Sequence, residues 1–188
     1  MHDIRHPIQC IIPPYMLDAM VQKGAKKVRS SALKAMKQSD HLRMQRSMMQ
    51  EQPRVDREGL MAAVEAHTCR LTRRVYDARN HETLPGYLTR GEGDPPTHDG
   101  AVDEAYDGAG DTWNLYHDEY GRCSIDDRGM ILDQTVHYGE EYNNAFWNGE
   151  QMVYGDGDGE LFARFTTDVD IIAHELTHGV TQYEAALV

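Results

Sequence analysis

The sequence predicts an α+β fold in which long helices pack against a mixed or antiparallel sheet. Apolar residues recur at helical spacing in three stretches, strand-like runs separate the last two, and turn residues bound each run. The chain has 188 residues, enough for one ordinary domain or a smaller domain with a leader. Its content of 40% apolar and 27% charged residues is typical of a globular protein. No apolar run approaches the ~18 residues of a membrane-spanning helix.

The N-terminal part predicts a basic amphipathic helix after Pro13-Pro14. Apolar side chains recur near every fourth position over residues 16–36, with lysines and arginines between them. A proline is well tolerated in the first turn of a helix, which places the start of this helix there. The polar stretch 38–58, which contains Pro53, is predicted to be a linker.

The remaining elements follow in order. Turn residues dominate positions 80–100, which predicts irregular surface. A helical period then covers 102–120 and ends at Gly121. Two hairpins are predicted at 123–138 and 151–165, with turns at 126–129 and 155–159. The pattern Thr167-x-x-Asp170 matches a capping box and predicts a last helix through residues 171–185.

Charge divides the chain into two parts of opposite sign. Residues 1–54 hold ten basic residues against four acidic ones, whereas residues 55–188 hold nine against twenty-seven. An acidic body does not suit nucleic acid, because phosphate binding needs a basic surface. The basic leader suits an acidic partner, which leaves nucleic acid, lipid headgroups and its own acidic body as alternatives to a simply solvated helix.

The three cysteines do not form a disulfide framework. Cys10, Cys69 and Cys123 are an odd number, and no CxxC pair is present. We expect free, mostly buried thiols, with one pair able to bridge only in an oxidising compartment.

One motif carries chemistry, the pattern His174-Glu175-x-x-His178. On a helix, residues four apart share a face and lie about 6 Å apart along the axis, so both imidazoles can reach one zinc ion. Glu175 lies a quarter-turn away, at the edge of the site, where it can take a proton from a zinc-bound water. The alternative interpretation is a pair of surface histidines on a helix.

A third zinc ligand is not evident, although catalytic zinc usually has three protein ligands. Asp170 shares the face of His174, but Asp170 and His178 are about 12 Å apart along the axis, too far for one ion. Glu184 lies off that face, and the sequence ends at Val188, ten residues after His178. A site of two histidines is expected to bind zinc weakly.

Several longer motifs carry a family resemblance. These are His137-Tyr138-Gly139, YNNAFWNG at 142–149, MVYGDGDG at 152–159 and DIIAHELTHGVT at 170–181. With them, residues 74–188 resemble the N-terminal part of the thermolysin family of secreted zinc endopeptidases. The segment IIPPYML at 11–17 resembles the short propeptide of the protealysin-like branch. The resemblance implies a propeptide at 1–50, a linker and maturation region at 51–73, and an incomplete catalytic N-terminal domain at 74–188.

The resemblance also implies roles for individual residues. His174 and His178 would bind zinc, Glu175 would be the catalytic carboxylate, and Asp170 would bind calcium. Asn144 and Ala145 would lie on the edge strand that pairs with a peptide or protein substrate, and Trp147 would shape the same edge. The cofactors that the resemblance implies are therefore Zn²⁺ and Ca²⁺.

The leader is expected to inhibit its own catalytic domain. Pro13, Pro14 and Tyr15 would lie in the cleft while the lysines face acidic surface. A Cys10 thiolate is a candidate zinc ligand in the latent form. The alternative for Cys10 is a buried thiol beside Ile11 and Ile12.

Two function classes remain open at this stage. In the resemblance, the third zinc ligand, a glutamate, and a helical C-terminal domain would follow Val188. We therefore expect a zinc metalloendopeptidase precursor that is inactive or barely active as this fragment. The alternative is a non-catalytic truncated module or decayed gene product. The family is secreted, but residues 1–9 show no signal-peptide apolar region, so cytoplasmic accumulation also stays open.

Overall fold

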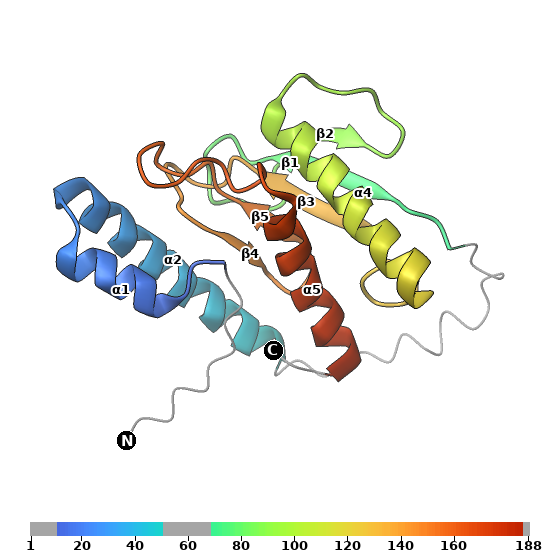
Figure 1. Cartoon of the computed structure of the whole chain (residues 1–188), viewed down its shortest axis with the longest axis horizontal. Helices are drawn as coiled ribbons and strands as arrows, with labels where there is room; N and C mark the ends of the chain where they lie inside the picture. Colours follow the sequence, from blue (N-terminus) through green and yellow to red (C-terminus); the bar gives the residue numbers. More distant parts are fainter. Residues whose placement is uncertain (1–10, 51–68, 186–188) are drawn as a thin grey trace.

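The computed structural model describes residues 11–50 and 69–185 (Figure 1). It confirms the α+β class, with helices on a mixed sheet. The helices are α1 (Pro14–Lys23), α2 (Lys26–Gln50), α4 (Gly100–Tyr120) and α5 (Val169–Ala185). The strands are β1 (Arg73–Asp77), β2 (Tyr87–Gly91), β3 (Leu132–Val136), β4 (Ala145–Trp147) and β5 (Met152–Tyr154). In these residues no helix is long and apolar enough to cross a membrane.

The five strands form one sheet in the order β2-β1-β3-β5-β4. The inner pairs β1/β3 and β3/β5 are parallel, and the outer pairs β1/β2 and β4/β5 are antiparallel. Val75 pairs with Gln134 in the centre, and Phe146 pairs with Val153 near the far edge. This order leaves β4 at an edge, beside the leader helices (Figure 1).

Helices α4 and α5 pack against the sheet and against each other. Helix α4 begins at Asp99, whose carboxylate accepts the N–H groups of Ala101 and Val102, and it ends at Gly121 in the left-handed region (φ 65°). The two helices approach closely at Gly108, where a Cβ atom would lie only 2.5 Å from Cδ1 of Ile172. The predicted helix over 102–120 is therefore confirmed. The absence of a side chain at Gly108 lets α5 pack closely against α4.

The prediction of a hairpin at 123–138 is wrong. Only Leu132–Val136 forms a strand, and it pairs in parallel with β1 and β5 rather than with its own upstream segment. Upstream, Ser124, Asp127 and Gly129 adopt positive φ angles of 65°, 56° and 87°. The Asp126 carboxylate accepts the N–H groups of Arg128 and Met130. Such side-chain bonds satisfy the backbone locally and replace a β ladder.

The prediction of a hairpin at 151–165 is also wrong, because β5 pairs with β4, the strand that precedes it in the sequence. Residues 155–165 form a loop. Asp158 organises that loop by accepting the N–H groups of residues 160, 161 and 162. Although burial opposes its ionisation, the bonds from Asn143 and from these N–H groups lower the pKa of Asp158 to about 2.

Three further predictions need correction. Residues 80–100 are not wholly irregular, because they contain β2, an exposed edge strand. The leader forms two helices rather than one, since Gly24 has an extended backbone (ψ 157°) and ends α1. Residues 38–50 belong to α2 and not to a linker, while residues 51–58 lie outside the described residues. The last helix is confirmed, although Thr167 precedes it and donates to the carbonyl of Arg164.

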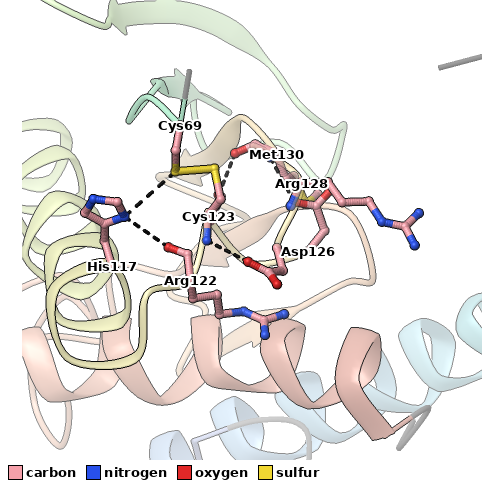
Figure 2. The surroundings of a disulfide bond; sticks show 9 residues. Cys69, His117, Arg122, Cys123, Asp126, Arg128 and Met130 are labelled. Carbon is pink, nitrogen blue, oxygen red and sulfur yellow. Dashed lines mark hydrogen bonds between the residues drawn. A yellow bond between two sulfur atoms is a disulfide. The ribbon is translucent and has the colours of Figure 1, made fainter. Parts of the chain in front are cut away.

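The expectation of free thiols is wrong for two of the cysteines. Cys69 and Cys123 form a disulfide with a Cα–Cα distance of 5.6 Å (Figure 2). The bond joins the segment before β1 to the residues after α4, which are 54 positions apart in the sequence. Spacing alone does not reveal such a pair, because the fold brings the two segments together. Cys10 lies outside the described residues.

Candidate metal centre

Helix α5 presents His174 and His178 on one face. Their Nε2 atoms are 3.1 Å apart, with His174 exposed and His178 half-buried. Two nitrogens bound to one tetrahedral zinc at about 2.0–2.1 Å lie roughly 3.3 Å apart, so this pair fits a shared zinc ion. Among the described residues, the candidate metal cluster consists of His174, Glu175 and His178, with ligand atoms within 4.8 Å of one another.

Glu175 is fully buried, which differs from the edge position expected from helix geometry. Its Oε2 accepts the backbone N–H of Trp147 on β4 at 3.1 Å. The carboxylate therefore lies between α5 and the edge strand, oriented by the backbone and close to both imidazoles. Burial and, to a smaller extent, the negative charge of Glu175 raise the pKa of Tyr154 well above its ordinary value.

The residues expected to bind substrate lie at an edge strand, β4, and their role in binding substrate stays a prediction. Ala145 and Trp147 are both buried, and Asn144 immediately precedes the strand. The Trp147 indole Nε1 donates to Oε1 of Gln182 at 2.9 Å, which ties β4 to the end of α5. The sequence indicated Trp147 as part of this edge, whereas Gln182 carried no signal of its own.

Comparison of the sequence with protein-family models identifies the family of this chain. Residues 33–182 match the family model described as the thermolysin metallopeptidase catalytic domain. The chain belongs to the thermolysin metallopeptidase family. Four-fifths of the chain lies within the match, which begins inside α2 and ends just after the histidine pair.

Similar proteins agree with this assignment. The chain is 43% identical over 182 residues to an extracellular metalloprotease of Pectobacterium carotovorum subsp. carotovorum, covering 97% of the chain and 50% of that protein. It is 41% identical over 178 residues to protease PrtS of Photorhabdus sp. (strain Az29), covering 95% and 47%. The solved precursor of protealysin from Serratia proteamaculans matches with a TM-score of 0.77 and 41% identity, covering 96% and 48%. The chain thus spans about half the length of these relatives.

In this thermolysin-family chain, the leader contacts the edge strand. The backbone N–H of Ile12 donates to Oδ1 of Asn144 at 3.1 Å, and the same oxygen accepts the N–H of Ala145. Ile12 and Leu17 are buried, while Pro13 and Pro14 are half-buried. Tyr15 is 68% exposed, so its ring takes little part in the contact within the described residues.

A second leader contact lies away from the histidines, along α2. Lys27 pairs with Glu160 at 3.2 Å, and the Nζ of Lys34 donates to the carbonyl of Glu140. The amide Nδ2 of Asn143 donates to Oγ of Ser31 at 2.7 Å. The hydrogen bond and charge of Glu160 raise the pKa of Lys27. These contacts fit the expectation that leader lysines face acidic surface.

Reasoning from the sequence missed a charged cluster around His137. Its Nδ1 lies 2.8 Å from a carboxylate oxygen of Asp156, and its Nε2 lies 3.1 Å from Oδ2 of Asp99. The hydrogen bond that the His137 imidazole donates to Asp156 outweighs burial and, with Asp99, raises the pKa of His137 to about 9. The cluster joins the start of α4 to the 155–159 loop. The motifs containing His137 and Asp156 were noted, but only as signs of family.

Asp170 lies exposed in the first turn of α5, where its Oδ1 accepts the N–H of Ile171. Within the described residues it belongs to no metal cluster. Its calcium role stays a prediction.

Proposed function

We propose that the chain is the leader and first part of the catalytic domain of a zinc metalloendopeptidase precursor. Residues 1–50 would be the propeptide, 51–73 the linker and maturation region, and 74–188 the catalytic portion. The observation that supports this best is the pair of imidazole nitrogens 3.1 Å apart beside the buried, oriented carboxylate of Glu175. Membership of the thermolysin family supplies the reaction class, hydrolysis of peptide bonds.

His174 and His178 would hold the zinc ion. A zinc ion in such a site polarises a carbonyl and lowers the pKa of a bound water to about 7. Glu175 would accept the proton from that water and later return it to the leaving amine. Its bond from the N–H of Trp147 orients the carboxylate beside the two imidazoles, where it would handle the proton. The surrounding burial strengthens these electrostatic interactions.

The edge strand β4 would bind an extended peptide. In an antiparallel ladder, successive residues direct their backbone groups to opposite sides. The carbonyl of Asn144 accepts the N–H of Gly155, and the N–H of Asn148 donates to the carbonyl of Gln151, so Asn144 and Asn148 direct their backbone groups towards β5. Ala145 and Trp147 therefore direct their carbonyl groups away from β5. An extended substrate can donate to those carbonyls in the manner of an added strand.

The leader would block this edge until it is removed. The bond from Ile12 to Asn144 lies beside Ala145, the same place where a substrate backbone would pair. Since one relative is named an extracellular metalloprotease, we also propose that the mature protein is secreted. We also propose that Asp170 binds calcium, from the family resemblance, and that Cys10 ligates zinc in the latent form, from thiol chemistry.

Zinc content tests this proposal. The purified full chain, dialysed to equilibrium against rising concentrations of buffered free zinc, is expected to bind one zinc per chain with the weak affinity of a two-histidine site. His174→Ala with His178→Ala should abolish that binding, whereas Glu175→Gln should retain it. In a protein extended to the length of the relatives, Glu175→Gln should lower peptide hydrolysis by about 10²–10⁴-fold. Absence of zinc binding in the unaltered chain would instead favour the non-catalytic module.

A further inference from the structure

The residues after α4 form a fastened loop, here termed the cystine loop (residues 122–130). The disulfide ties Cys123 in this loop to Cys69 ahead of β1, and both residues are half-buried (Figure 2). Inside the loop, the N–H of Cys123 donates to Oδ1 of Asp127, and Oγ of Ser124 donates to the carbonyl of Met130. The loop contains no helix or strand, so these bonds and the disulfide determine its shape.

One side chain of the cystine loop reaches the helix that bears the histidines. Ile125 is 2% exposed, and its Cγ2 would lie 2.6 Å from a Cβ atom placed on Gly179. The Trp147 ring lies 3.2 Å from the same point. Ile125 therefore packs against α5 one residue after His178, beside the residue whose N–H holds Glu175.

A second contact fixes the loop to the same helix. The guanidinium of Arg122 pairs with Glu184 on α5 and donates to the carbonyl of Ile125 at 2.7 Å. Arg122 is nearly buried, whereas Glu184 is exposed. This arginine thus joins the loop backbone at Ile125 to α5, and the disulfide holds the adjacent residue Cys123.

We propose that the cystine loop positions the metal centre and that Ile125 is its positioning residue. Two groups hold this part of α5 in place: Ile125 from the loop, and the Trp147 ring from β4, which also donates to Gln182 on α5. Loss of the Ile125 contact leaves a cavity under Gly179, into which the helix can shift. A shift there moves His178 relative to His174 and moves Glu175 relative to the N–H of Trp147. This inference rests on the proposed zinc site.

The first test removes the Cys69–Cys123 disulfide from the full chain. Cys69→Ser with Cys123→Ser is compared with the disulfide-bonded chain, both carrying Cys10→Ser so that no thiol competes for metal. Zinc affinity is measured by competition with a chromophoric chelator, and the visible spectrum of bound Co²⁺ reports ligand geometry. We expect the dissociation constant for zinc to rise about tenfold, the lower end of the effect of groups that orient metal ligands, and the Co²⁺ bands to shift. Equal affinity and identical bands would overturn the proposal.

The second test changes the contact and keeps the disulfide. Ile125→Ala should reproduce the weaker zinc binding, and Ile125→Val should restore affinity to within about twofold of the unaltered chain. Ile131→Ala is the matched control, because Ile131 is 38% exposed and lies just beyond the loop. If Ile125→Ala and Ile131→Ala bind zinc equally well, Ile125 is not a positioning residue.

A readout without metal separates this inference from the zinc proposal. Amide hydrogen exchange over residues 174–182 should be faster in Ile125→Ala than in Ile131→Ala, with circular dichroism showing that both chains are folded. If the unaltered chain binds no zinc, the proposed function fails, and the exchange rates still decide the role of the loop. Unchanged exchange in Ile125→Ala would overturn the inference.

Discussion

The cluster around His137 predicts a pH-dependent stability with a definite sign. The Asp156 and Asp99 carboxylates raise the pKa of His137 from 6.5 to about 9 in the folded chain. A group whose folded-state pKa is raised contributes stability that is fully present below its unfolded pKa. That contribution is lost as the pH rises through the folded value. The window for this loss therefore runs from pH 6.5 to about 9.

The magnitude follows from the two pKa values and the exposure of the carboxylates. At 1.36 kcal/mol per pH unit, the difference between 6.5 and about 9 sets an upper bound of ~3.4 kcal/mol. The side chains of Asp99 and Asp156 are 41% and 35% exposed, so solvent screens their attraction. We expect the protonated His137 to contribute ~1–2 kcal/mol.

His137→Asn is a suitable perturbation. His137 has a φ of 54°, and asparagine tolerates this left-handed backbone better than other neutral side chains except glycine. His98→Asn is the matched control, because His98 also has a positive φ (67°) but is exposed. Both replacements therefore change an imidazole to an amide on similar backbone, and only one disturbs the cluster.

The assay is urea unfolding of each chain at pH 6 and at pH 9. Relative to His137→Asn, the unaltered chain should lose ~1–2 kcal/mol of unfolding free energy between the two pH values. The His98→Asn chain should follow the unaltered chain, since other groups that titrate in this range are common to all three. If all three chains lose the same free energy over this window, the attribution to His137 is refuted.

Three further perturbations have expected outcomes. Trp147→Phe removes the bond to Gln182 and should cost ~1 kcal/mol of unfolding free energy in urea titration, whereas no change would mean that this bond does not seat β4 on α5. Arg73→Leu leaves the half-buried carboxylate of Glu92 without its bidentate arginine partner and should lower the free energy of unfolding by ~2–4 kcal/mol in the same measurement. A loss below ~1 kcal/mol would contradict that reasoning. Lys27→Ala removes an exposed pair and should leave the midpoint of urea unfolding unchanged, whereas a clear fall in the midpoint would show that the pair is better shielded than its exposure indicates.

The sequence predicted most helices and the fold class because these depend on local patterns. The apolar period over 102–120 and the left-handed cap at Gly121 need no distant partner. Strand pairing depends on distant segments, and there the predictions failed. The run ending at Val136 was paired with its neighbour in sequence, but it pairs with β1, some sixty positions earlier. The disulfide between Cys69 and Cys123 was missed for the same reason.

The candidate site was predicted as far as helix geometry reaches. The four-residue spacing correctly placed His174 and His178 together. It could not show that Glu175 is buried against β4, because the strand that holds it comes from another part of the chain. Ile125 and Gln182 gave no signal either, since an apolar residue in a turn and a glutamine on a helix are common. The contact of Ile125 with α5 and the bond between Gln182 and Trp147 depend on tertiary packing alone.

The leader and the cystine loop hold the candidate site from different sides. Ile12 reaches the edge strand at Asn144, whereas Ile125 supports the helix at Gly179. The two groups meet through β4, since Asn144 precedes the strand and Trp147, beside Ile125, ends it. If the leader blocks this edge as proposed, its removal would open the edge without releasing α5, because the disulfide joins Cys69 and Cys123, both outside residues 1–50. On that proposal, a cut between residues 50 and 69 would leave the Cys69–Cys123 disulfide intact, so the histidine pair would keep its geometry when the leader is removed.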